Sequence, residues 1–144
     1  MTTKPAPHEA PAQALAAVVA ASGPPGQAEL TTLQALDAYR RLRISRERFV
    51  ELVQACADEP GGQIAGQSWL SLAAQTRLDR ALDAVQDRAD RLLVCRLAAA
   101  AITADGHVTA AERLAYDHAR ARWHITASEV TQAILHDPAG RGAA

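Results

Sequence analysis

The sequence predicts an all-α protein, and three observations carry that prediction. Hydrophobic residues make up 49% of the 144 residues, whereas aromatic residues make up only 3%. The apolar content is mainly Ala, Leu and Val, and both Ala and Leu are strong helix formers. No segment alternates apolar and polar residues as a half-buried strand does. We therefore expect about six or seven helices, no sheet and a single domain.

Local signals delimit the expected helices in the first half of the chain. Residues 13–21 form an apolar helix, which a Ser-Gly-Pro-Pro-Gly segment ends. A second helix covers 28–42 and carries its leucines on one side. Ser45 is a good N-cap for a third helix, which a Glu-Pro-Gly-Gly segment at 59–62 ends. The apolar residues of this helix recur at amphipathic spacing and are Phe49, Leu52, Val53 and Cys56.

The second half is expected to hold four more helices. Residues 67–85 form a helix that could break near Thr76. Residues 87–104 form a long helix, which we expect to be the most buried one because apolar residues nearly encircle it. Two capping boxes then start the last helices, 109–122 and 126–135; they are Thr109 with Glu112 and Thr126 with Glu129.

Composition at the two ends sets the expected domain limits. Residues 1–11 are rich in Pro and Thr and form a flexible lead-in, 12–136 form the helical domain, and 137–144 form a flexible tail. The net charge of −1 does not favour nucleic acid as a partner. Two cysteines without metal spacing are expected to be free thiols in a reducing compartment, and no apolar run spans a membrane. We therefore expect a soluble cytoplasmic protein.

The two halves of the chain share an internal pattern. Residues 14–23 and 97–106 are similar apolar stretches that both end in Gly. In each half a Glu follows that Gly six residues later, and an Ile with a hydroxyl residue follows after the next helix. These residues are Glu29 with Ile44 and Ser45, and Glu112 with Ile125 and Thr126. The pattern predicts a pseudo-two-fold repeat of a three-helix unit, whose apolar faces pack together.

Residues 89–130 contain an apolar helix that ends in Ala-Asp-Gly, a Glu that opens the next helix, and a turn with an apolar residue and a hydroxyl cap. These residues are Ala104, Asp105, Gly106, Val108, Glu112, Ile125 and Thr126. The motif resembles the hallmark of the tellurite-resistance TerB-like family. The resemblance implies an all-α bundle with an internal two-fold repeat. It also implies a stress-response protein that acts as a non-enzymatic interaction module with another protein.

The acidic turn of this motif has two open interpretations. Asp105 and Glu112 flank one tight turn, and two neighbouring carboxylates can bind a hard divalent cation. Glu29 would add a third carboxylate across the pseudo-two-fold axis, although Ser22 stands where the second half has Asp105. In the other interpretation Asp105 caps the turn and Glu112 completes a capping box, with no metal.

Arginines crowd the second turn of each half. Arg40, Arg41 and Arg43 in the first half, with Arg120 and Arg122 in the second, form a candidate patch for an acidic partner or a phosphate. A solvated face of helix C-terminal cations is the alternative. No phosphate loop, nucleophile elbow or zinc helix is present, so we expect no enzyme. Two functions remain: the TerB-like module, or a metal-free protein–protein adaptor that uses the basic patch or an apolar groove.

Overall fold

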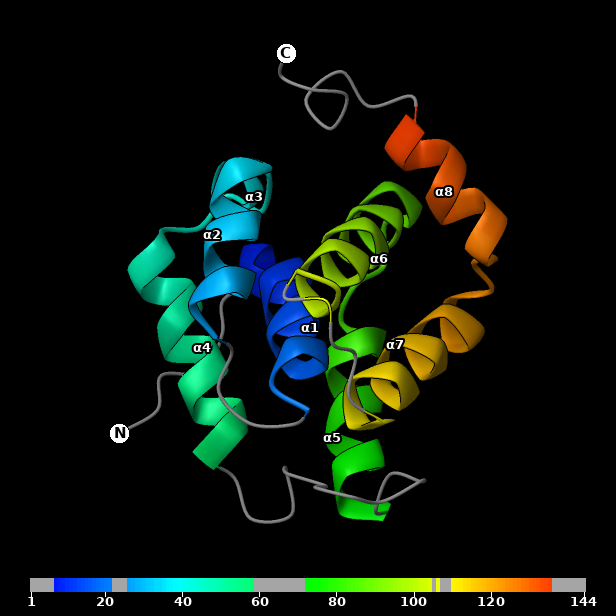
Figure 1. The fold of residues 1–144 in the computed structure, drawn as a ribbon. Coiled ribbons are helices and arrows are strands. Elements are labelled where there is room, and N and C mark those ends of the chain that lie inside the picture. The colour runs from blue at the N-terminus through cyan, green and yellow to red at the C-terminus, as the bar shows by residue number, and fades with distance from the viewer. Residues whose placement is uncertain (1–6, 22–25, 59–71, 105, 107–109, 136–144) are drawn as a thin grey trace.

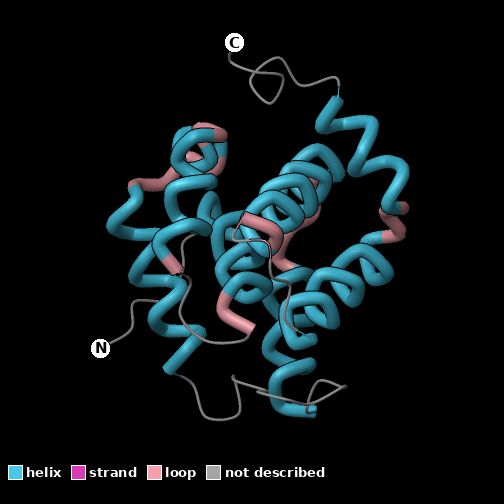
Figure 2. Tube along the Cα trace, in the orientation of Figure 1, coloured by secondary structure: helices cyan, strands magenta, loops and turns pink. Residues whose placement is uncertain are grey.

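The computed structural model describes residues 7–21, 26–58, 72–104, 106 and 110–135. Within these ranges the chain forms eight α-helices and one 3-10 turn and contains no strand, which confirms the predicted all-α class (Figure 2). None of these helices has the length and hydrophobicity that crossing a bilayer requires. The elements are η1 Pro7–Glu9, α1 Ala10–Val19, α2 Gln27–Ala35, α3 Ala38–Arg41, α4 Arg46–Asp58, α5 Leu72–Asp83, α6 Arg88–Ile102, α7 Ala110–Trp123 and α8 Ala127–Leu135.

Helix α1 lies at the centre of the bundle, with α4 on one side and α6 on the other (Figure 1). It also contacts α5 and α7, while α6 contacts α2, α7 and α8. The expectation that 87–104 is the most buried helix was wrong. Six of the ten residues of α1 are buried, against six of the fifteen in α6. Charged residues in the first turn of α6 keep that end of the helix at the surface, whereas α1 carries none.

The first helix begins at Ala10 rather than at residue 13. Pro11 stands in its first turn, where the missing backbone N–H costs no hydrogen bond. Glu9 immediately before it is buried and receives a two-pronged ion pair from Arg48 of α4. The Nε–Oε2 distance is 2.9 Å and the Nη2–Oε1 distance is 3.2 Å. This pair joins the start of α1 to α4.

The helix count exceeds the expected six or seven because the predicted helix 28–42 is divided. Asp37 adopts a left-handed backbone conformation with φ 60°, which separates α2 from α3. Leu33 and Ala38 are both fully buried. In one straight helix these two residues would lie about 140° apart around the axis, so the break lets both face the core. By contrast, the expected break near Thr76 does not occur, because Thr76 lies inside α5.

Two turns 81 residues apart have the same backbone geometry. Arg43 after α3 and His124 after α7 both adopt left-handed conformations, with φ 59° and 56°. In each turn the next residue, Ile44 or Ile125, donates its N–H to the carbonyl five residues earlier, at 2.9 Å in both cases. Each turn is therefore a Schellman C-cap, which satisfies carbonyls at the end of a helix.

The hydroxyl residue after each turn caps the following helix, as predicted. The Ser45 Oγ accepts from the backbone N–H of Arg48 at 3.1 Å, and the Thr126 Oγ1 accepts from that of Glu129 at 3.1 Å. Glu129 also accepts from the backbone N–H of Thr126 at 3.1 Å, which confirms the second capping box. Thr109 of the other predicted box and Gly23 of the repeat lie outside the described residues.

We expect Leu15→Ala in α1 to lower the free energy of unfolding by about 2–5 kcal/mol, because the substitution leaves a cavity at a site with no exposed surface. Urea denaturation measures the loss. Leu135→Ala in α8 is the matched control, since Leu135 is 54% exposed and should change stability by less than about 0.5 kcal/mol. Similar losses for the two variants would contradict the central position of α1.

Candidate functional site

The structure describes two of the three carboxylates that the sequence predicts as metal ligands, Glu112 and Glu29. Glu112 lies in the first turn of α7 and is only 3% exposed, and Glu29 lies half-buried in the first turn of α2. Both helices pack against α6. Gly106 has φ +81°, a conformation that favours Gly in the Ala-Asp-Gly turn. Asp105 itself lies outside the described residues.

The predicted metal site therefore stays a prediction. Across the part of the chain that the structure describes, no group of three or more His, Cys, Asp or Glu side chains is arranged to hold a metal ion. In the predicted set of Asp105, Glu112 and Glu29, Asp105 lies outside that part.

The arginines predicted as a binding patch fall into different environments. Arg120 donates to Asp117 at 3.0 Å and stacks over the Tyr116 ring, with 5.2 Å from Cζ to the ring centroid. Arg40 is largely exposed and pairs with Asp37 of its own turn at 3.4 Å. Arg120 therefore contacts two residues of its own helix, and Arg40 contacts the residue just before its helix.

Arg122 belongs to a network of charges between α5 and α7. Its guanidinium donates to both oxygens of Asp83, at 2.7 and 2.8 Å, and lies 3.3 Å from Asp79. His118 also contacts Asp79, with 2.5 Å between Nε2 and Oδ1. The buried Trp123 indole donates to the Leu82 carbonyl at 3.1 Å in the same seam. Arg122 therefore connects α7 to α5 through two carboxylates.

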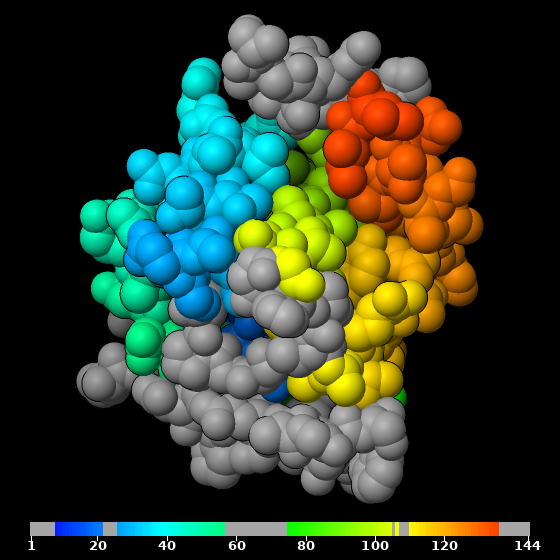
Figure 3. Space-filling view, in the orientation of Figure 1, coloured from blue at the N-terminus to red at the C-terminus, as the bar shows by residue number. Residues whose placement is uncertain are grey.

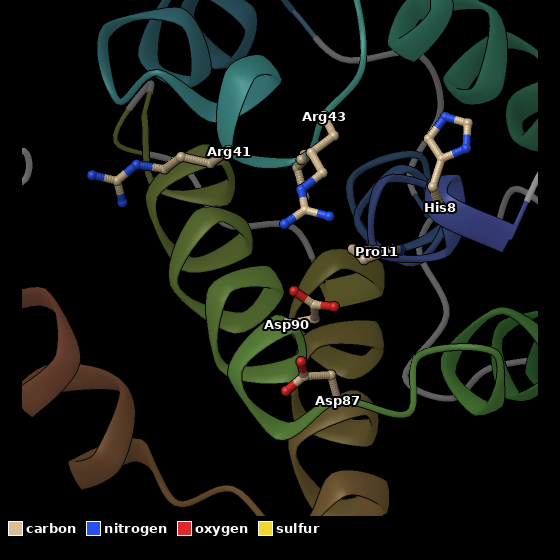
Figure 4. Close-up of a pocket in the computed structure, with 7 residues that line it drawn as sticks. His8, Pro11, Arg41, Arg43, Asp87 and Asp90 are labelled. Carbon is tan, nitrogen blue, oxygen red and sulfur yellow. The ribbon is translucent and has the colours of Figure 1, made fainter.

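Arg41 and Arg43 instead line a pocket of about 180 Å³. Figure 4 shows Arg43 at the end of α3 with its guanidinium directed toward Asp90, and Asp87 beside it at the start of α6. His8 and Pro11 form another wall, and the buried Leu42 contributes an apolar surface. The pocket thus joins a basic wall from the first half of the chain to an acidic wall from the second.

Local structure fixes the two charged walls. Arg43 occupies the left-handed position of the Schellman turn after α3. Asp87 is the N-cap of α6, and its Oδ1 accepts from the backbone N–H of Ala89 at 2.9 Å. Asp90 follows in the first turn, where a carboxylate is favoured by the helix dipole. Among the described residues, no ion pair joins Arg43 to Asp87 or Asp90.

Sequence reasoning missed the acidic wall of this pocket. Asp87 and Asp90 carry the ordinary pattern of a helix start, which gives no sign that they face Arg43. Only the packing of the chain brings the two walls together. His8 and Pro11 fall within the predicted lead-in, and no local signal in the sequence indicates that they line this pocket.

The cysteines offer no reactive group at this pocket. Both Cys56 and Cys95 are free thiols, as expected. Burial raises the pKa of the Cys95 thiol to about 12, so this group stays protonated and unreactive at neutral pH. Cys56 is half-buried, and its Sγ accepts from Gln13 Nε2 at 3.6 Å.

We expect the Asp83–Arg122 pair to stabilise the fold at neutral pH and to lose that effect in acid. Hydrogen bonds from Arg122 lower the pKa of Asp83 below its usual value of about 3.9. A carboxyl whose pKa is lower in the folded state stabilises that state above the unfolded pKa, and the contribution disappears as pH falls through the folded pKa.

Urea denaturation of wild type and Asp83→Asn between about pH 7 and pH 2 measures this effect, and the stability difference should shrink with falling pH. Arg122→Gln should remove the same pH dependence, because it removes the charged guanidinium that lowers the pKa of Asp83. A stability difference that stays constant over the whole range would show that Asp83 acts through its shape rather than its charge.

No protein-family model matches this chain, and no curated protein or solved structure matches it significantly.

Proposed function

We propose that this chain is a TerB-like, non-enzymatic interaction module of the tellurite-resistance and stress-response kind. The observation that carries the proposal is the pair of Schellman turns, each followed by an Ile and a hydroxyl cap. Their common geometry supports the pseudo-two-fold repeat that the resemblance implies. We extend the repeat to the whole three-helix unit, with Glu29 and Glu112 at equivalent helix starts.

A weak divalent-cation site at the acidic turn is part of this proposal. Asp105, Glu112 and Glu29 would supply oxygen ligands of the kind that hard cations prefer. Two observations support the proposal: the left-handed Gly106 and the burial of Glu112. A cation is attracted more strongly to a carboxylate that is shielded from water than to one at the surface.

The second candidate is a metal-free protein–protein adaptor. Helix α8 favours this alternative because it lies on the outside of the molecule and carries exposed apolar side chains (Figure 3). Ile134 is 38% exposed and Leu135 is 54% exposed. In this alternative Glu112 serves only to start α7, and a partner uses the apolar surface or the remaining basic residues.

Thermal melts with added cations separate the two candidates. A cation that binds only the folded state stabilises it by about 2.7 kcal/mol at a hundredfold excess over its Kd. The wild-type melting temperature should therefore rise with metal and fall with chelator. Asp105→Asn should abolish this response and leave the metal-free melt nearly unchanged, because it keeps the side-chain shape but removes the charge.

Two further variants complete this experiment. Glu47→Gln removes an exposed carboxylate from the first turn of α4 and should leave the metal response unchanged. Glu112→Ala should cost about 0.5–2 kcal/mol in any metal concentration if Glu112 only caps α7. A wild-type melt that does not respond to calcium, magnesium, manganese or zinc would remove the cation site and leave the adaptor.

The cellular role is tested separately by growth. Deletion of the gene in its native host should lower the tellurite concentration that stops growth, and the wild-type copy should restore it. If the acidic turn carries the function, Asp105→Asn should not restore growth, whereas Glu47→Gln should. Equal tellurite tolerance with and without the gene would overturn the stress-response proposal.

A further inference from the structure

We propose that the pocket between α3 and α6 docks a segment of a partner protein that presents a basic and an acidic side chain close together. The proposal rests on the proposed function, because it assumes an interaction module, and it names the chemistry of the partner. The pocket combines Arg43 on one wall with Asp87 and Asp90 on the other (Figure 4).

Two charged side chains of this pocket, Arg43 and Asp90, differ from the charged residues that connect other helices. Arg48 pairs with Glu9, Arg88 with Glu129, and Arg122 with Asp83, and each pair joins two different helical elements. In contrast, no ion pair within the described ranges uses Arg43 or Asp90. Both groups line the same pocket, so a ligand could satisfy both at once.

The two walls recognise opposite charges at fixed positions. A guanidinium such as Arg43 can hold a carboxylate through two parallel hydrogen bonds. The carboxylates of Asp87 and Asp90 can accept from the Arg or Lys of a partner. A phosphate or a nucleic acid fits less well, because its negative charge would also meet these two carboxylates. A segment with one charge of each sign satisfies both walls.

The size of the pocket favours side chains over a free metabolite. Small-molecule sites usually have volumes of about 300–1,000 Å³ and mainly apolar linings. This pocket has about 180 Å³, and five of its seven lining residues are His, Arg or Asp. Side-chain anchors at protein interfaces fill small pockets of this kind.

The backbone under both walls is held in place before any ligand binds. A Schellman turn fixes Arg43, and the N-cap hydrogen bond fixes Asp87. Leu42, only 2% exposed, anchors the basic wall in the core. Binding would therefore order side chains and no backbone, which lowers its entropic cost.

The main alternative is that Arg43 and Asp90 pair with each other in solution, since Figure 4 shows them facing one another. The two possibilities predict different results. An internal pair would make Arg43→Gln and Asp90→Asn each destabilise the fold, with the double variant losing less than the sum. A docking site would leave stability nearly unchanged and alter peptide binding.

We would titrate the full-length, isotope-labelled protein with acetyl-Arg-Glu-amide and follow the backbone amide resonances by NMR. Saturable shifts should centre on residues 42–43 and 87–90, with a Kd in the millimolar range expected for two anchors. Acetyl-Gln-Gln-amide should cause no such shifts. Asp90→Asn and Arg43→Gln should each weaken binding by about fivefold or more, which corresponds to about 1 kcal/mol.

Arg46→Gln and Glu47→Gln are the matched controls. Each removes one exposed charge from the first turn of α4, outside the pocket, and should leave the Kd unchanged. The proposal is overturned if the charged peptide gives no saturable shifts, if the uncharged peptide gives the same shifts, or if the Asp90 and Arg43 variants bind as well as wild type. If the peptide does not bind and the double variant loses less stability than the sum of the two single variants, Arg43 and Asp90 form an internal pair.

This test separates the pocket from the broader proposal. Peptide binding at the pocket is measured without metal and without growth on tellurite. If the peptide does not bind but the metal melt and the growth assay are positive, only the docking proposal is wrong. If the peptide binds but the metal melt and the growth assay are both negative, the TerB-like role is wrong and the docking site stands.

Discussion

The burial of α1 is the constraint on which the rest of the structure depends. Ala12, Ala14, Leu15, Ala16 and Val18 have no exposed surface, and the helix contacts α4, α5, α6 and α7. Because side chains in such a core are close-packed, none of the four neighbours can move without opening a cavity beside α1. Contacts from α4 on one side and from α5, α6 and α7 on the other also make α1 the element that joins the two halves of the chain.

The features that the sequence predicted best are those that depend on a few neighbouring residues. The caps at Ser45 and Thr126 and the amphipathic spacing around Phe49 involve residues within one or two helical turns, so their side-chain types are sufficient to specify them. The division at Asp37 was not predictable in this way. The surrounding residues favour helix throughout, and the break depends on bringing Leu33 and Ala38 into one core.

The candidate sites follow the same distinction. The local motif around Gly106 predicts Glu112 as a site residue, and the structure buries Glu112 at the start of α7. The cluster of arginines predicts Arg43 as a site residue but does not predict its acidic neighbours. Asp87 and Asp90 have local roles as the cap and first turn of α6, and these roles fully explain their presence in the sequence. Only the positions of α3 and α6 in the bundle, which no single segment specifies, turn them into the wall of a pocket.

A ligand at this pocket would also affect the stability of the fold. Elsewhere charged pairs connect separate elements: Glu9 with Arg48, Arg88 with Glu129, and Asp83 with Arg122. No such pair joins Arg43 to Asp90, which line the pocket between α3 and α6. A partner segment that binds both side chains would supply that connection from outside. Because it would bind only when both walls are in place, it would stabilise the folded state by an amount set by its concentration relative to its Kd. Binding at this pocket and the stability of the fold are therefore linked.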